Sequence, residues 1–260
     1  MKAIRNKVGL EAEYFLYKDG KLVFPGSYGF DTDDFALIGE FRADPGDTRE
    51  SALANFFVSY FGVIQKAKRL GLTVEFKSHE DVSPAMYSEA MRRMGTKEIS
   101  KCDNIYGTDM MSLSDAVVES GELKFHRVSC GLHIHFSSDV SESETIRSGE
   151  YAPFELPLNI GGVDTSIRLF KKVTSMERKI KVSASCITKP VINHIVSNLD
   201  KELLLKYMKG INVELKYRRP GWYEVKSDGR FEYRSLPFTD DVISDIVDIV
   251  DFAFNQLDEI

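Results

Sequence analysis

Apolar residues alternate with polar ones at the start of the chain and predict a β-hairpin. Aromatic and β-branched residues are frequent over residues 8–17 and again over residues 21–24, as is typical of strands. The Lys-Asp-Gly sequence at positions 18–20 favours a tight turn between the two strands. Short strands are also expected over residues 39–43 and 73–77.

Helical periodicity predicts the longer elements. Over residues 48–70 apolar side chains recur every three or four positions, and the Asp-Pro-Gly-Asp segment at 44–47 supplies a turn and a helix cap. The expected core-facing stripe of this helix consists of Leu53, Phe56, Phe57, Tyr60, Phe61 and Ile64. Further helices are expected over residues 83–94, 162–181, 190–209 and 240–257.

The remaining segments contain strand and loop signals. Residues 123–137 are interpreted as a strand pair or as one strand bent at Gly131, and residues 225–237 as a hairpin with its turn at 227–229. Serine and glutamate are abundant after position 137, so a mobile loop is expected at 138–158. No internal repeat or linker divides the chain, which predicts a single domain over residues 1–260.

Composition and charge narrow the class of protein. Of 260 residues, 43% are hydrophobic and 28% are charged, which is ordinary for a folded globular protein. The net charge of -6 argues against broad binding to a phosphate backbone, although a local basic groove would still allow nucleic acid. Three scattered cysteines without a CxxC pair indicate neither a disulfide framework nor a structural zinc site. Without a signal-peptide core or a run of about 18 apolar residues, a cytoplasmic protein is expected.

Four short strand segments share a pattern that a core strand does not need. Glutamate, histidine or arginine occupies positions i and i+2 of each segment, and an alanine, isoleucine or aromatic residue lies between them. The four segments are Glu11-Ala12-Glu13, Glu40-Phe41-Arg42, His133-Ile134-His135 and Glu232-Tyr233-Arg234. Because side chains alternate along a strand, a sheet containing these segments would have one charged face and one apolar face.

The charged face would have the composition of a cation and phosphate site. Carboxylates suit Mg²⁺ or Mn²⁺, imidazole is better tolerated by Mn²⁺, and arginine neutralises a transferred phosphoryl group. Each pair alone is also typical of a solvated strand face or a surface ion pair. The functional interpretation is favoured because the pairs occur together with a basic segment, KYRRPGW at 216–222, directly before the last hairpin.

These motifs resemble those of the glutamine synthetase and γ-glutamylcysteine ligase superfamily, and most closely the phage-associated carboxylate-amine ligases of the second type. The resemblance spans nearly the whole chain, in the order VGLEAEYF, GEFRADPG, CGLHIHFS, YRRPGWYE and RFEYRSLP. It implies an α+β fold with a curved antiparallel sheet, helices on the convex face and the active site on the concave face. This chain is much shorter than glutamine synthetase, and the glutamate- and ammonium-binding residues of that enzyme have no convincing counterpart here.

The resemblance also implies a role for each motif residue. The metal ligands would be Glu11, Glu13, Glu40, His133 and Glu232, divided between two or more Mg²⁺ or Mn²⁺ ions. The contacts to the nucleotide would come from His135, Arg218 and Arg234. The residues acting on the transferred phosphate or the acyl phosphate would be Arg218, Arg219 and Arg234.

The function implied is ATP-dependent joining of a carboxylate to an amine through an acyl phosphate, with release of ADP and phosphate. Its partners would be small-molecule carboxylate and amine substrates, with a peptide or a modified nucleobase as other acceptors. The chain would be a monomer or small homo-oligomer without a membrane partner, in the host cytoplasm if it is phage-encoded. Asp44, Glu80 and Asp81 are candidates for the general base. The alternatives are a guanidino-kinase-like phosphotransferase and a non-catalytic nucleotide- or metal-binding domain.

Overall fold

The computed structural model describes residues 2–95, 102–107, 114–146, 151–160, 163–172, 176–182, 187–213, 215, 218–227 and 229–259. The chain divides into two compact units. We call Asn6–Ser138 together with Ile187–Ile260 the main unit, and Met1–Arg5 together with Asp139–Cys186 the second unit. Every residue to which the sequence assigns a metal, phosphate or catalytic role lies in the main unit.

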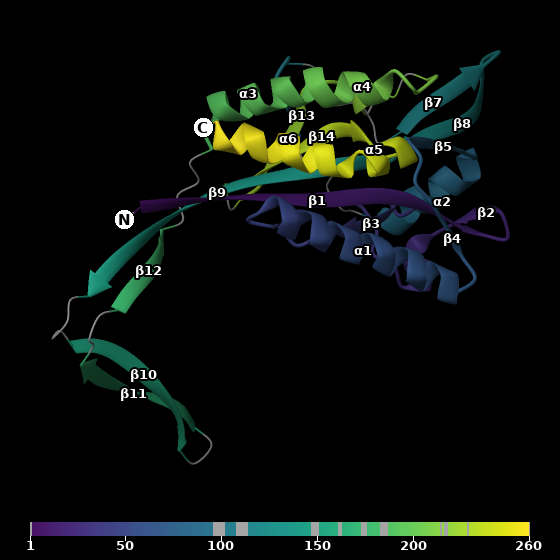
Figure 1. Cartoon of the computed structure of the whole chain (residues 1–260). Coiled ribbons are helices and arrows are strands. Elements are labelled where there is room, and N and C mark those ends of the chain that lie inside the picture. The colour runs from purple at the N-terminus through teal and green to yellow at the C-terminus, as the bar shows by residue number, and fades with distance from the viewer. Residues whose placement is uncertain are drawn as a thin grey trace. The chain divides into compact units, whose positions relative to one another are not determined.

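The main unit is a mixed α+β structure built on a mostly antiparallel sheet (Figure 1). The strands that enter this sheet are β1 (Lys2–Lys18), β2 (Lys21–Val23), β3 (Gly39–Arg42), β4 (Thr73–Glu75), β6 (Asp103–Asn104), β9 (Gly131–Ile146), β13 (Trp222–Val225) and β14 (Phe231–Pro237). The strand order is β2-β1-β9-β14-β13-β6, and β3 and β4 also pair with β1. This order places β1, β9 and β14, which carry three of the four charged motifs, side by side.

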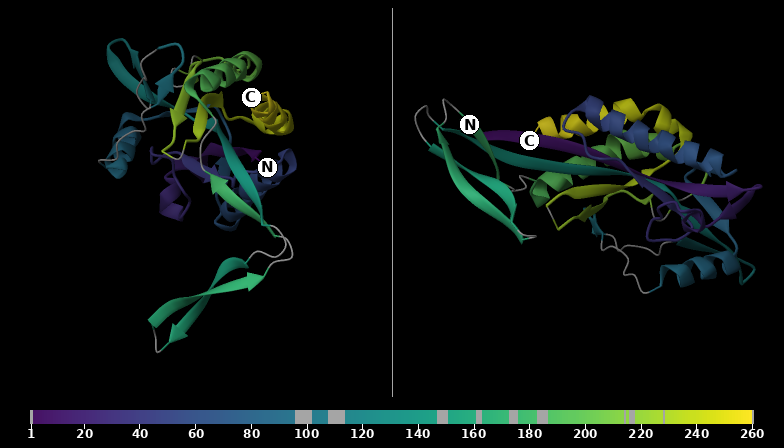
Figure 2. Two further views of the ribbon diagram at one scale, coloured as in Figure 1. Left: turned by 90° about the vertical axis from the view of Figure 1, so that its left-hand side faces the viewer. Right: turned by 90° about the horizontal axis from the view of Figure 1, so that it is seen from below.

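Helices cover one face of the sheet, which we call the back face. Figure 2 shows α1 (Arg49–Arg69), α3 (Lys189–Leu199) and α6 (Ile246–Asp258) along the same side of the strands. The central residues of the four motifs are buried in one cluster with side chains of these helices, namely Ala12, Phe41, Ile134 and Tyr233 with Phe56, Ile195 and Ile249. The predicted alternation of an apolar and a charged face is therefore confirmed.

Among the described residues, a second layer packs on the opposite, front face at one end of the sheet. There Phe15 and Tyr17 of β1 pack with Val82, Ala90 and Val128 in a second buried cluster. The covering elements are β5 (His79–Val82), β7 (Ser114–Glu119), β8 (Glu122–Ser129) and α2 (Pro84–Met94), and the three strands form a separate sheet in the order β5-β8-β7. Because Glu11 and Glu13 precede Phe15 on the same face of β1, the charged motifs lie beside this cover.

Most predicted elements of the main unit are confirmed, with corrections at their ends. The first hairpin pairs Leu16 with Val23. The helix predicted over 48–70 is capped by Thr48, whose side chain accepts a hydrogen bond from the Ser51 amide at 3.2 Å, so the expected cap at 44–47 is wrong. The other helical segments are a 3-10 turn at Pro25–Tyr28, the π-helix η2 (Asp200–Leu204), α4 (Leu205–Met208) and α5 (Asp240–Ser244). The expected terminal helix is divided into α5 and α6 at Asp245.

Residues 123–137 contain two strands, but the two belong to different sheets. β8 pairs with β5 and β7, whereas β9 begins at Gly131 and enters the main sheet. The Cys130 amide between them donates to the Ser78 carbonyl at 3.0 Å. The hairpin predicted over 225–237 is confirmed as the antiparallel pair of β13 and β14.

The second unit corrects one prediction of the sequence. The helix expected over 162–181 is wrong, because these residues form β11 (Val163–Lys172) and β12 (Met176–Val182). β11 pairs with β10 (Tyr151–Ile160), and β12 pairs with the end of β9. Apolar residues alternate in period two along both hairpin strands, and the register places Leu156 opposite Ile167, which explains strand formation. The segment 138–158, expected as a mobile loop, is in strand conformation up to Ile146 and again from Tyr151.

Two further predictions concern thiols and membranes. Cys102 and Cys130 are free thiols, and Cys186 lies outside the described residues. In the part of the chain that the structure describes, none of the helices has the length and apolar character needed to cross a membrane.

Candidate functional site

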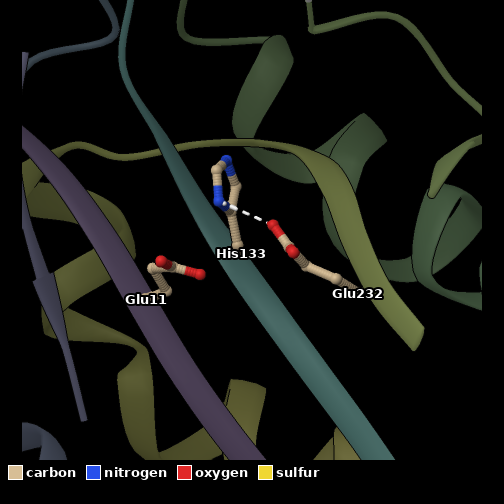
Figure 3. A group of neighbouring side chains, drawn as sticks. All are labelled: Glu11, His133 and Glu232. Atoms are coloured by element: carbon tan, nitrogen blue, oxygen red, sulfur yellow. Dashed lines mark ion pairs between the residues drawn. The ribbon is translucent and has the colours of Figure 1, made fainter. Parts of the chain in front are cut away.

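Three neighbouring strands bring two glutamates and a histidine together at the centre of the front face. Glu11 extends from β1, His133 from β9 and Glu232 from β14, and Figure 3 shows the three side chains converging. Their potential ligand atoms all lie within 4.8 Å of one another. His133 Nδ1 is 2.9 Å from Glu232 Oε1. All three residues are buried, with at most 5% exposed, so they do not form a solvated strand face.

Two further carboxylates adjoin this triad. Antiparallel pairing of β1 with β3 places Glu13 opposite Glu40, and Glu11 opposite Arg42. Arg42 donates to Glu11 and, at 2.6 Å, to Glu40 Oε2. Burial and the adjacent Glu11 carboxylate raise the pKa of Glu40 to about 11. Burial also acts on Glu11, but hydrogen bonds from His135 and from protonated Glu40 outweigh it and hold the pKa of Glu11 well below its usual range. Glu11 and Glu40 thus share one proton, a distribution of charge that a cation would replace.

The shared proton predicts an unusual pH dependence for a substitution at Glu40. The pKa of the Glu40 carboxyl is raised in the folded state, so the folded chain keeps a proton that the unfolded chain releases above the ordinary pKa of 4.5. The free energy of unfolding therefore falls as pH rises towards 11. Replacing Glu40 by glutamine removes this loss. We expect metal-free E40Q to gain about 1 kcal/mol over the native chain between pH 6 and pH 9, since Arg42 and solvent moderate the effect. Urea unfolding at both pH values measures this, and a constant difference between the two proteins would contradict the shared proton.

Glu13 pairs with Arg218 next to His133 of the triad. Arg218, 1% exposed, pairs with the Glu13 carboxylate, and its Nη1 donates to the Arg234 carbonyl at 2.7 Å. The same Nη1 lies 3.2 Å from His133 Nε2, and the Gly131 amide donates to Glu13 Oε2 at 2.6 Å. Burial outweighs the attraction of Arg218 and raises the pKa of Glu13. Arg218 therefore bridges the basic segment before β13, the β14 backbone and the carboxylates of β1.

Gly131 makes room for this arginine. A Cβ atom at position 131 would lie 2.3 Å from the Arg218 guanidinium carbon, which is closer than atoms approach. Substitution of Gly131 by alanine should displace Arg218 and destabilise the fold by about 1–3 kcal/mol, the usual cost of overpacking. Thermal unfolding measures the loss, and Gly62→Ala is a matched control because no atom lies within 4 Å of its added Cβ. Equal stability of G131A and the native chain would contradict the placement of Arg218.

Basic residues surround Glu232, the third member of the triad. Arg234 Nη1 lies 2.8 Å from Glu232 Oε1, and Lys226 Nζ lies 2.6 Å from Glu232 Oε2. Both cations also contact Glu224, at 3.2 Å and 3.0 Å respectively. Burial raises the pKa of Glu232, but His133 and Arg234 outweigh it and keep this carboxyl ionised. An ionised carboxylate beside a histidine is suited to hold a divalent cation.

A cavity of about 370 Å³ opens next to Glu11 and His135. Four cationic side chains line it, namely Lys7, Arg42, Lys226 and Arg230. His135 Nε2 lies 2.7 Å from Glu11 Oε2, while its buried Nδ1 has no hydrogen-bond partner within the described residues. Cationic side chains in this lining would suit an anionic ligand adjoining the triad.

The structure brings most of the predicted site residues together. The residues with contacts in the cluster are Glu11, Glu13, Glu40, His133, His135, Arg218, Glu232 and Arg234. Arg219 follows Arg218 and is partly exposed. Of the candidate general bases, Asp81 is paired with Arg127 at 2.8 Å, Glu80 accepts from Tyr17 at 2.6 Å, and Asp44 is exposed.

Sequence reasoning missed two contributors that follow the same i, i+2 pattern. Glu224 and Lys226 flank Val225 and join the cluster at Glu232. Asp33 flanks Thr32 together with Asp31, and Thr32 forms a bridge with Gly39 beside β3. After burial, the Asp33 charge is among the causes that raise the pKa of Glu13 and Glu40. Extending the search for alternating charges beyond the four motifs would have found both segments.

Comparison with protein-family models, with curated proteins and with solved structures finds no match for this chain. Its function is therefore inferred from the geometry and chemistry of the site itself.

Proposed function

We propose that this chain is an ATP-dependent carboxylate-amine ligase with a glutamine synthetase-like catalytic sheet whose concave face is the front face described above. The observation that carries the proposal is the buried group of Glu11, His133 and Glu232, whose ligand atoms lie within 4.8 Å of one another beside a cavity lined by cations. A cation site next to an anion site is what a metal-bound polyphosphate requires.

The burial of this group is difficult to explain as a structural feature alone. Removing carboxylates from water costs several kcal/mol each, about 20 in the idealised limit, and replacing buried ion pairs by apolar residues is often neutral or stabilising. Here Glu11, Glu13, Glu40 and Glu232 are all buried on one face. Two of them, Glu11 and Glu40, have opposite pKa shifts, because burial and their proximity disfavour ionisation of both carboxyls at once. Selection for binding explains this cost better than selection for stability.

The donors fit Mn²⁺ or Mg²⁺. In the proposal Glu11, His133 and Glu232 hold one ion, and Glu13 with Glu40 holds a second. Such ions would neutralise the charge of the polyphosphate and of the transferred phosphoryl group. The imidazole ligand favours Mn²⁺ over Mg²⁺.

The basic residues would bind and orient the phosphates. In this assignment Lys7, Arg42, Lys226 and Arg230 bind the polyphosphate in the cavity, where they converge around Glu11 and His135. In the same assignment Arg218, Arg219 and Arg234 act on the transferred phosphate. A substrate carboxylate attacks the γ-phosphorus of ATP, ADP leaves, and an amine then displaces phosphate from the acyl phosphate. The contribution of the protein is alignment and charge neutralisation.

The substrates are proposed only by class. A small carboxylate and a small amine are proposed as the substrates, and a peptide or a modified nucleobase is the larger alternative for the acceptor. Product analysis separates this reaction from phosphoryl transfer to a guanidino group. A ligase releases free phosphate and an amide, whereas a kinase leaves a phosphorylated product.

Calorimetric binding of a non-hydrolysable ATP analogue tests the proposal. We expect the native chain to bind the analogue in the presence of Mn²⁺ or Mg²⁺ and not in EDTA, and Glu232→Gln and Arg218→Ala to weaken binding. Glu89→Gln is a matched control, because Glu89 lies on α2 and pairs with Arg92 and Arg93. Absence of binding by the native chain with either metal would contradict the proposal.

A further inference from the structure

A buried carboxylate on the back face contacts the strand that carries Glu232. Asp200, 4% exposed, begins the π-helix η2 between α3 and α4. It accepts hydrogen bonds from the Tyr233 hydroxyl at 2.8 Å and from the Tyr106 hydroxyl at 3.2 Å. Tyr233 lies between Glu232 and Arg234 on β14, so Asp200 holds the strand from the face opposite to the site.

Asp200 also reaches the segment that follows Arg218. It accepts a hydrogen bond from the Gly221 backbone, and the Gly221 carbonyl accepts from the Ile105 amide at 3.0 Å. Gly221 has a φ of 90°, and a Cβ atom there would lie 2.6 Å from the Tyr106 ring. The turn that contains Gly221 is therefore packed tightly between Asp200 and residues 104–106.

The same turn is tied to β14 on its other side. The Trp222 amide donates to Ser235 Oγ at 3.0 Å, and Asn104 Nδ2 donates to the Pro220 carbonyl at 2.9 Å. Residues 218–222, which we call the arginine turn, thus have a defined position relative to Glu232 and Arg234. One carboxylate contacts both the turn and the strand.

The local helix geometry supports a role beyond helix formation. The π-helix is rare in proteins, and short π segments are frequent at functional sites. The π-helix η2 begins at Asp200, the residue that contacts Tyr233, Tyr106 and Gly221. A regular helix would satisfy the same backbone groups without burying a carboxylate.

We propose that Asp200 is a positioning residue that fixes the arginine turn against β14 and so sets Arg218, Glu232 and Arg234 for the cation and phosphate site. Its consequence for ligand binding rests on the proposed function. Its consequence for the position of the turn does not, because the hydrogen bonds that hold the turn are made between protein groups.

The experiment compares two aspartate–tyrosine pairs in the full chain. Asp200→Ala and Tyr233→Phe alter the proposed anchor, and Asp200→Asn is the conservative variant. Asp245→Ala and Tyr207→Phe are matched controls, because the Tyr207 hydroxyl donates to Asp245 at 3.0 Å between α4 and α6. Trp222 is the only tryptophan and lies in the arginine turn, so acrylamide quenching of its fluorescence reports on the turn. Calorimetric titration with Mn²⁺ gives the affinity of the site.

We expect Asp200→Ala to weaken Mn²⁺ binding by about tenfold or more, as loss of an outer-shell partner does. Trp222 should become more accessible to acrylamide in this variant, Tyr233→Phe should change both readouts in the same direction, and Asp200→Asn should restore part of each. The control variants should lower only the melting temperature.

Two results would overturn the inference. The first is that Tyr233→Phe and Asp200→Ala both bind Mn²⁺ as tightly as the native chain and show the same quenching of Trp222 fluorescence. If Asp200→Ala does not fold, Tyr233→Phe and Asp200→Asn decide. The second is that the native chain binds no Mn²⁺ and the variants show the same quenching of Trp222 fluorescence as the native chain. In that case the failure of Mn²⁺ binding contradicts the proposed function separately, and quenching alone decides the role of Asp200.

Discussion

Replacing Arg218 by alanine is expected to lower the free energy of unfolding by about 3–5 kcal/mol in the metal-free protein. Arg218 is buried beside Glu13, so its removal leaves a buried carboxylate without its cation. It also removes the hydrogen bond to the Arg234 carbonyl and opens space above Gly131. Urea unfolding followed by circular dichroism measures the loss.

Two comparison variants separate the lost pair from a general effect of losing an arginine. Arg92→Ala removes an exposed arginine that pairs with Glu89, and should leave the unfolding midpoint nearly unchanged. The double variant Glu13→Gln/Arg218→Met removes both charges, and should be more stable than Arg218→Ala because no uncompensated charge remains buried. A loss below about 1 kcal/mol in Arg218→Ala would show that the buried pair does not hold the site together.

The second large effect concerns stabilisation by metal. A ligand that binds only the folded state at a concentration one hundred times its Kd stabilises it by about 2.7 kcal/mol. Mn²⁺ should stabilise the native chain by about this amount under those conditions, and EDTA should reverse the effect. Glu232→Gln should lose this stabilisation, because the neutral amide replaces the ionised ligand of the triad.

The comparison must be made against each protein without metal. Removing Glu232 also deprives His133, Arg234 and Lys226 of an anionic partner, so the metal-free baseline will change. Glu89→Gln should keep the full Mn²⁺ increment, since its carboxylate lies on α2. An increment in Glu232→Gln equal to that of the native chain would exclude Glu232 as a ligand.

The sequence predicted the two faces of the sheet because strand alternation is a local property. Ala12 and Ile134 are apolar residues between charged neighbours, and both are buried on the back face as expected. Order along the chain did not reveal which strands are neighbours. The structure places β9 between β1 and β14, and this brings the potential ligand atoms of Glu11, His133 and Glu232 within 4.8 Å of one another.

Features that depend on long-range packing could not be predicted. Arg218 reaches Glu13 over 205 positions of sequence, through a space that exists only because residue 131 lacks a side chain. Asp200 has no local signal for its contacts to Tyr106 and Tyr233, which arise from the docking of helices on the sheet. The helix predicted over 162–181 is wrong for a different reason, since the period-two alternation after Val163 favours a strand.

In the proposed function, three strands form a divalent cation site beside a polyphosphate cavity. Anomalous diffraction from a crystal of the native chain grown with Mn²⁺ and a non-hydrolysable ATP analogue tests this arrangement. We predict an anomalous peak coordinated by Glu11, His133 and Glu232, with the phosphates of the analogue beside His135 and Arg42. A well-ordered crystal that shows neither a peak within this triad nor phosphate density in the adjoining cavity would contradict the account.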